Sequence, residues 1–195
     1  MSDTKRKRDR TAHLVYELLR EIGENPDRDG LKQTPKRVSE ALEYFLQGYG
    51  IDVDALVSGA IFAEKQKGMV LLKDVDFYSI CEHHFVPFFG KCHIAYLPKN
   101  KIIGLSKLAR VVDAFARRLQ VQERMTNDIA RTIERHLEPH GVGVVIEAQH
   151  LCMMMRGVEK QNSLATTSTM LGAFEQDAAT RLELFSLLGN LRAAY

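Results

Sequence analysis

Cysteine is scarce in this sequence, and its scarcity indicates the compartment in which the protein is expected to fold. The 195 residues contain three cysteines, Cys81, Cys92 and Cys152. A disulfide framework calls for more cysteines in even number, whereas an odd and scattered set is typical of a reducing compartment. We therefore expect a cytoplasmic protein whose thiols serve packing or metal binding.

The sequence also lacks a large excess of either charge. Lys and Arg number 27 against 25 Asp and Glu, a net charge of +2, so we expect neither nucleic acid nor a membrane as a partner. Residues 1–10 are rich in Lys and Arg, but no apolar segment follows that resembles a signal peptide or a membrane span. These residues are predicted to form a solvated basic tail, and any anion site must be local.

What the sequence does contain is typical of one globular domain with an extension. Hydrophobic residues make up 45% of the chain and charged residues 27%, which argues against disorder and against a coiled coil. A chain of this length is too short for two large independent domains. We predict an N-terminal helical extension over residues 11–60, followed by a catalytic domain over residues 61–195.

Two amphipathic helices are predicted in the extension. Apolar residues recur at helical spacing from Leu14 to Ile22. Thr34 then offers a capping hydroxyl and Pro35 a proline at the first helical position, before an apolar stripe that runs on to Tyr49.

From Met69 onward, apolar residues recur at every second position, which is typical of strands. Further along the chain, segments with strand-like spacing and segments with helical spacing follow one another. The predicted elements are strands near 69–80 and 88–97, helices near 105–118 and 123–138, strands near 142–152 and 164–174, and a closing helix marked by Leu184, Leu187, Leu188 and Leu191. The order β-β-α-α-β-β predicts an α+β fold, with a mostly antiparallel sheet and both helices on one face. A four-stranded sheet leaves two exposed edges, which edge-to-edge assembly into a closed oligomer would cover.

A half-site for a metal lies between the first two strands of this pattern. Cys81 and His84 are three residues apart, a spacing that lets a thiolate and an imidazole bind one tetrahedral ion. Spacing alone leaves the further ligands open among His83, Cys92, His93, His136, His140, His150 and Cys152. No second close Cys/His pair of the zinc-finger type is present, which favours a catalytic site of three ligands with one open position.

Strand alternation narrows these candidates. His150 and Cys152 are predicted to emerge on the same face of one strand, as an imidazole and a thiolate on an otherwise apolar face. The alternative is that Cys81 and Cys152 are small buried residues and the histidines are core groups with hydrogen bonds. Cys92 alternates with strand residues and is predicted to serve packing alone.

Two further segments are suited to a nucleotide. Ser106, Lys107 and Arg110 stand at a predicted helix start, where free N–H groups and the helix dipole attract anions such as phosphates; a solvated basic face is the alternative. Glu123, next to Gln122, opens the following helix, and a carboxylate can accept two parallel hydrogen bonds from guanine, although acidic residues are also ordinary at helix starts.

Together these motifs resemble one family, GTP cyclohydrolase I. The resemblance is carried, in order, by Cys81-Glu82-His83-His84, by Gly104 through Arg110, by Gln120 through Arg124, and by His150-Leu151-Cys152-Met153 through Val158. It extends from about Thr34 to Phe174, most of the chain.

The resemblance implies a fold, an assembly and a reaction. The fold is the tunnelling fold, whose subunits join sheet to sheet and stack as a toroidal decamer with active sites between subunits. The reaction converts GTP and water into 7,8-dihydroneopterin triphosphate and formate.

The resemblance also implies a role for each candidate residue. The zinc ligands would be Cys81, His84 and Cys152, with His83 and His150 left free for proton transfer. Ser106 would lie near the ribose. The substrate contacts would be Glu123 with Gln122 for guanine, and Lys107, Arg110, Arg156 and Arg37 for the triphosphate.

Two rivals remain open at this point, a related enzyme and a protein of another class. One is a related tunnelling-fold enzyme, such as a pyruvoyl-tetrahydropterin synthase or a queuosine-pathway reductase, which uses a three-histidine metal site or no such zinc site. The other is a zinc-stabilised module without enzymatic activity that binds RNA through the basic tail.

Overall fold

The computed structural model describes residues 3–189 and divides the chain into two units, Met1–Gln47 and Gly48–Tyr195. The predicted boundary at residue 60 therefore differs from the observed division. Helix α3 (Val53–Ser58) belongs to the second unit because Val57 is buried in its hydrophobic core.

The first unit consists of helices α1 (Asp3–Glu21) and α2 (Thr34–Phe45). Residues 5–10, predicted to form a solvated basic tail, are exposed, but they belong to helix α1, which begins at Asp3. Lys and Arg are good helix formers, and the backbone carbonyl of Arg8 accepts a hydrogen bond of 2.8 Å from Ser39 Oγ of α2. The predicted Thr34 cap is also wrong: Gln33 is the N-cap residue, and no side chain caps this helix.

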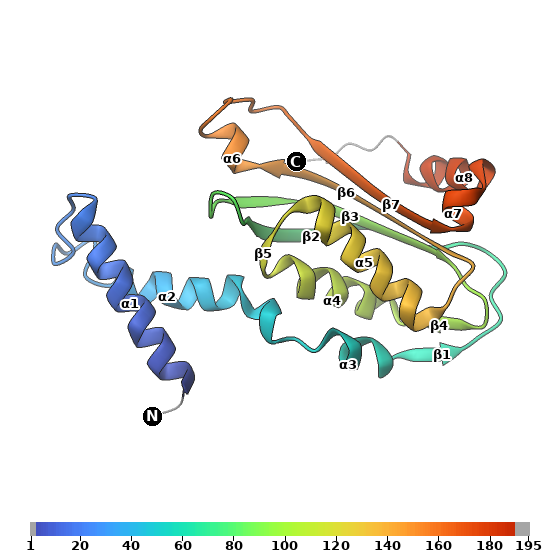
Figure 1. Ribbon diagram of the computed structural model, residues 1–195, viewed down its shortest axis with the longest axis horizontal. Helices are drawn as coiled ribbons and strands as arrows, with labels where there is room; N and C mark the ends of the chain where they lie inside the picture. The colour runs from blue at the N-terminus through green and yellow to red at the C-terminus, as the bar shows by residue number, and fades with distance from the viewer. Residues whose placement is uncertain (1–2, 190–195) are drawn as a thin grey trace. The chain divides into compact units, whose positions relative to one another are not determined.

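The second unit is built on a five-stranded sheet in the order β5-β2-β3-β6-β7 (Figure 1). Its strands are β2 (Val70–Cys81), β3 (Pro87–Leu97), β5 (Leu119–Gln120), β6 (Gly141–His150) and β7 (Ala165–Gly172). All neighbours are antiparallel except β5, which runs parallel to the last residues of β2. A separate two-stranded sheet pairs β1 (Ile61–Ala63) with β4 (Lys101–Ile103).

Helices α4 (Leu105–Ala116) and α5 (Gln122–Leu137) cover one face of the large sheet, as predicted (Figure 1). Buried residues of both helices join those of β2, β3 and β6 in the main core. Helices α7 (Ala173–Gln176) and α8 (Ala178–Leu188) contribute to a smaller cluster on the other face, and the predicted Leu191 of the closing helix lies outside the described residues. The α+β tunnelling fold is thus confirmed.

Strand β6 ends earlier than predicted. Its pairing with β7 stops at Ala148 and its pairing with β3 stops at His150, so the chain has no ladder partner beyond that point. Cys152 lies instead in the short helix α6 (Leu151–Met154). The prediction that His150 and Cys152 share one strand face is therefore wrong.

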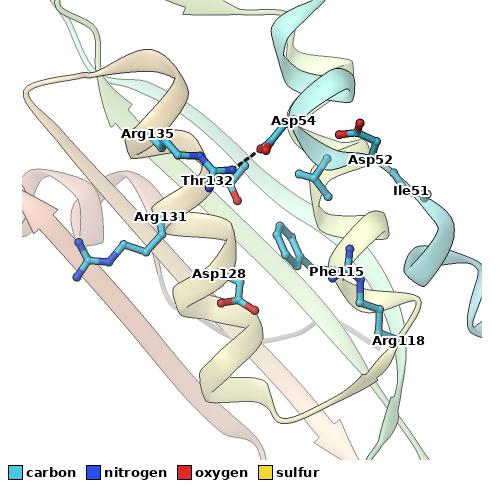
Figure 2. A pocket seen from close by; sticks show the side chains of 10 residues that line it. Ile51, Asp52, Asp54, Phe115, Arg118, Asp128, Arg131, Thr132 and Arg135 are labelled. Atoms are coloured by element: carbon cyan, nitrogen blue, oxygen red, sulfur yellow. Dashed lines mark hydrogen bonds and ion pairs between the residues drawn. The ribbon is translucent and has the colours of Figure 1, made fainter.

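A pocket of about 500 Å³ opens between α3, α4 and α5 (Figure 2). Acidic and basic side chains line it together, and Asp54 of α3 is paired with Arg135 and, at 2.9 Å, with His136 Nε2 of α5. The pocket contains none of the residues predicted to bind metal or substrate, and these paired charges hold α3 to the helical layer. Between residues 3 and 189, no helix is long and apolar enough to cross a bilayer.

Candidate metal centre

The turn between β2 and β3 shapes the first half of the site. Cys81 is the last residue of β2, its N–H donates to the carbonyl of Val86 at 2.9 Å, and its carbonyl accepts from the N–H of Phe85 at 2.9 Å. Phe85 has a positive φ of 57°, which closes the turn within four residues of Cys81. The turn thereby brings the Cys81 thiol and the His84 imidazole close together.

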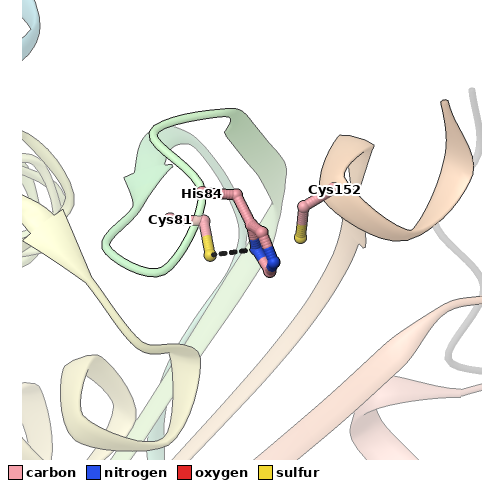
Figure 3. A group of neighbouring side chains, drawn as sticks. All are labelled: Cys81, His84 and Cys152. Carbon is pink, nitrogen blue, oxygen red and sulfur yellow. Dashed lines mark hydrogen bonds between the residues drawn. The ribbon is translucent and has the colours of Figure 1, made fainter. Parts of the chain in front are cut away.

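Helix α6 supplies the second half of the site. The donor atoms of Cys81, His84 and Cys152 all lie within 4.8 Å of one another, and Cys81 Sγ is 3.9 Å from His84 Nδ1 (Figure 3). In a tetrahedral zinc site, bonds of about 2.3 Å to sulfur and about 2.0 Å to nitrogen put the donors roughly 3.6–3.8 Å apart. The three side chains therefore fit a metal ion with little rearrangement.

The electrostatics of the two thiols agree with this fit. Both cysteines are buried, and burial together with the adjacent Cys81 thiol raises the pKa of Cys152. The sulfur atoms of Cys81 and Cys152 lie within 4.8 Å of one another, so two thiolates there would repel one another in a buried site unless a cation lay between them. A bound metal ion would supply that charge, so the donor chemistry suits zinc.

An ion pair ties the metal-binding turn to helix α5. Glu82, in the turn, is paired with Arg124, whose Nε also donates to Gln120 Oε1 at 3.1 Å. The hydrogen bond from Arg124 lowers the pKa of Glu82 and keeps its carboxylate ionised. Sequence reasoning assigned neither residue a role, since two charges 42 positions apart give no local signal.

His150 is fixed next to this cluster by two contacts. Its ring stacks on Phe88, with centroids 4.6 Å apart and planes 5° apart, and its Nε2 lies 2.7 Å from Gln122 Oε1. Burial lowers the pKa of His150, and the negative charge of Glu123 opposes part of that shift. Phe88 was missed because a phenylalanine in a strand is usually a core residue.

Other predicted residues gather at the same end of the sheet. Glu123 is exposed in the first turn of α5, and His83 Nδ1 lies 3.8 Å from Cys81 Sγ. Arg156 is exposed just after α6, where its charge acts on the Cys152 thiol. The residues brought together at this end are Cys81, His83, His84, Gln122, Glu123, His150, Cys152 and Arg156.

The remaining predicted residues lie elsewhere. Ser106, Lys107 and Arg110 occupy the start of α4, beside β4, whereas the chain returns to Cys81 only after α4 has ended (Figure 1). At about 1.5 Å of rise per residue, Ser106 and Lys107 stand roughly 14–15 Å, and Arg110 about 9 Å, from the end of α4 at Ala116, where the chain turns back toward the cluster. Arg37 is exposed on α2, in the first unit.

Three of the alternative ligands, His136, His93 and Cys92, are held elsewhere in the fold. His136 binds Asp54, and His93 Nδ1 accepts a hydrogen bond of 3.1 Å from the N–H of Asp74. Cys92 is fully buried in the main core, where burial raises its pKa, so the prediction that it serves packing is confirmed. Among the described residues, the group that can hold a metal is Cys81, His84 and Cys152.

Comparison with known proteins gives a consistent result. Residues 11–189 match the family model described as GTP cyclohydrolase I. A Leptospira biflexa protein named GTP cyclohydrolase 1 is 56% identical over 176 residues, 90% of this chain and 96% of the relative. Proteins of the same name from Coxiella burnetii and Dictyostelium discoideum are each 56% identical, over 91% and 89% of this chain and 96% and 75% of their own lengths.

Proposed function

Because the chain belongs to the GTP cyclohydrolase I family and is a GTP cyclohydrolase, we propose that its active site is built around zinc held by Cys81, His84 and Cys152. The reaction opens the imidazole ring of GTP with water and yields 7,8-dihydroneopterin triphosphate and formate. The observation that carries the zinc proposal is the convergence of two thiols and one imidazole within 4.8 Å. When bound, zinc supplies a Lewis acid that makes water a competent nucleophile near neutral pH.

His150 and His83 are proposed to move protons during ring opening and the release of formate. Burial keeps the His150 ring neutral at pH 7, so it is ready to accept a proton, and its stacking on Phe88 fixes the plane in which it does so. His83 is exposed beside Cys81, where it can exchange protons with solvent.

Glu123 is proposed to bind the guanine base. Its carboxylate is exposed at the start of α5, two positions before Met125 enters the core, so the backbone beneath it is firmly held. A carboxylate there can accept hydrogen bonds from the N1–H and the exocyclic amine of guanine in parallel.

The triphosphate is proposed to bind Lys107, Arg110, Arg156 and Arg37, with Ser106 near the ribose. Since Lys107 lies in the first turn of α4, away from the metal cluster, and Arg110 one turn further along the same helix, we propose that a second copy of the chain supplies them. The sheet offers the means of assembly: among residues 3–189, β7 is an edge strand and most of β2 has no strand on its outer side. In a toroidal decamer, strands of neighbouring subunits would pair with both edges of the sheet, and each active site would be completed between subunits.

The activity is tested by incubating the purified protein with GTP and measuring formate and fluorescent pterin. We expect both products in equal amounts, their loss on treatment with a chelator, and their return with added zinc. If the products form at the same rate after all metal has been removed, the proposed zinc site is wrong.

The shared active site is tested by mixing two impaired variants at a GTP concentration below KM, where weaker binding lowers turnover directly. Cys152→Ser lacks a metal ligand and Lys107→Ala lacks a phosphate contact, so neither should turn over GTP efficiently alone. If sites form between subunits, random reassembly from equal parts gives about a quarter of the sites with both elements intact, and activity returns. Mixed assemblies that stay inactive would place both elements in one chain.

A cytoplasmic location is also proposed. It is supported by the three cysteines, all of which are free thiols in the structure.

A further inference from the structure

The side chain of Gln122 is buried, and every polar group it has is bonded within the chain. Its Nε2 lies 3.1 Å from the carbonyl oxygen of Ile146, 3.0 Å from that of Ala165 and 3.1 Å from Thr167 Oγ1. Carbonyl oxygens only accept hydrogen bonds, so the amide nitrogen must face β6 and β7. Its oxygen is thereby turned toward His150, whose Nε2 is 2.7 Å away.

Two threonines lock this orientation. Thr126 Oγ1 lies 2.7 Å from the backbone carbonyl of Gln122 and 2.7 Å from Thr167 Oγ1. Thr126 has one hydroxyl hydrogen and gives it to the carbonyl, so Thr167 must donate its own hydrogen to Thr126. The Gln122 amide has two hydrogens for three acceptors, so the contact with Thr167 Oγ1 shares a hydrogen with one of the two carbonyls. Thr167 therefore has no hydrogen left for the Gln122 side chain, and a flipped amide would turn its oxygen toward two carbonyl oxygens and a hydroxyl that cannot donate to it.

This orientation dictates the protonation of the histidine ring. Gln122 Oε1 can only accept, so Nε2 of His150 must carry the hydrogen, and the lone pair of the neutral ring is on Nδ1. Phe88, fully buried, stacks on the ring and hinders the half-turn that would put the carbon Cε1 in the place of Nε2.

We infer that Gln122 is a positioning residue for His150, which it holds as the Nε2–H tautomer with Nδ1 available to exchange a proton with the substrate. This inference rests on the proposed proton-transfer role of His150. It also reassigns Gln122, which the sequence predicted to contact guanine: the amide supports the histidine, and base recognition is left to Glu123.

The tautomer can be measured directly by nitrogen-15 NMR on zinc-loaded protein labelled at histidine. We expect His150, identified by the signal lost in His150→Gln, to carry its hydrogen on Nε2. His93 provides an internal reference, because its Nδ1 accepts from the N–H of Asp74 and its own hydrogen must also be on Nε2. In Gln122→Met, the His150 signal should shift toward a mixture of tautomers while the His93 signal stays unchanged.

The kinetic test compares Gln122→Met with Gln120→Met. Gln120 is a buried glutamine two residues earlier whose Nε2 donates to the carbonyl of Phe115 and whose Oε1 accepts from Arg124, the partner of Glu82. Loss of a residue that orients a functional histidine typically costs about 10- to 100-fold in activity, so kcat should fall by that factor in Gln122→Met while KM for GTP changes little. Gln120→Met should lose stability, and its kcat should fall by no more than the few-fold expected from loosening the Glu82–Arg124 pair.

Three results would overturn the inference. One is an Nδ1–H tautomer of His150 in the unaltered protein, a measurement that does not require any variant to fold. The others are a raised KM with unchanged kcat in Gln122→Met, which would return Gln122 to base recognition, and a Gln122→Met variant that keeps full kcat. An unaltered protein that fails to release formate from GTP would instead contradict the proposed function, and the tautomer result would still stand by itself.

Discussion

The two ends of the sheet in the second unit differ in how far a single chain completes them. At the end where β2 and β6 finish, Glu82, His150 and Gln122 each have partners within the chain. At the start of α4, Lys107 and Arg110 make no side-chain hydrogen bond or ion pair with any residue between 3 and 189, and Gly104 caps the helix without a side chain.

This difference matches the two tasks. Bond-making groups must be held in place before the substrate arrives, because reorganising them during the reaction would raise the barrier. Flexible cations that bind a triphosphate can be supplied later, since each acts as a charge on a long side chain. The chain therefore prepares its chemical centre alone and is proposed to complete its phosphate site on assembly.

The largest loss of activity is expected from removing a proposed metal ligand at the end of the sheet where β2 and β6 finish, which we call the prepared end because its groups already have partners within the chain. In Cys152→Ser, a hydroxyl replaces a thiolate and binds zinc poorly, so metal content should fall sharply and turnover of GTP by more than about 100-fold. The chain should still fold, because its main core does not depend on the metal. Metal analysis and circular dichroism measure both.

Cys92→Ser is the matched control. Cys92 is fully buried in the core and has no part in the cluster, so this variant should lose stability but keep its zinc. Full metal occupancy in Cys152→Ser would remove Cys152 from the site.

Glu123→Ala should have the next largest effect. The guanine edge then loses a charged acceptor of two hydrogen bonds, and GTP turnover should fall by about 100-fold while zinc remains bound. Glu134→Ala is the control, because Glu134 is on the same helix, paired with Arg131 at 3.0 Å. Comparable turnover in the two variants would show that Glu123 does not read the base.

Most of the fold could be predicted because the long elements carry strong periodicity. Strands 69–80 and 88–97 and helices 105–118 and 123–138 differ from β2, β3, α4 and α5 by no more than two residues at either end. Strands β1 and β5 were not predicted, since strands of three and two residues are defined by their partners and have too few residues to show a period.

The site was predictable only where its signal is local or where the resemblance supplied it. Cys81 and His84 stand out by their spacing, but Cys152 reaches them from α6, and the strand alternation first used to place it was wrong. The Glu82–Arg124 pair and the stacking of Phe88 on His150 depend on tertiary contacts between separate elements. No short window of sequence contains both partners of either contact.

A smaller effect, specific to phosphate, is expected at the other end of the sheet. Lys107→Ala and Arg110→Ala should each weaken GTP binding by about 10- to 100-fold, since each charge-assisted hydrogen bond contributes roughly 1.5–3 kcal/mol. Guanosine lacks the phosphates and should bind nearly as before. Calorimetry with both ligands measures the difference, and equal losses for the two would show that these cations position something other than phosphate.

The smallest loss of activity is expected from a variant that removes the ion pair of the metal-binding turn but keeps all three proposed zinc ligands. Glu82→Gln breaks the ion pair with Arg124 and makes the metal-binding turn less constrained, so kcat should fall by only a few-fold, with faster loss of zinc to a chelator. Because Arg124 lowers the pKa of Glu82, the ion pair stabilises the fold above the usual carboxyl range, and this contribution disappears as the pH falls through the lowered pKa. The unaltered protein should therefore exceed Glu82→Gln in thermal stability at pH 7 and lose that advantage below about pH 4.

Glu138→Gln is the control at the opposite end: Lys101 lowers the pKa of Glu138 in the same way, so the same pH trend should appear without any change in zinc retention. If both variants lose zinc equally fast, the Glu82 contact is not what holds the turn in place, and the prepared end owes its geometry to the backbone hydrogen bonds of Cys81 alone.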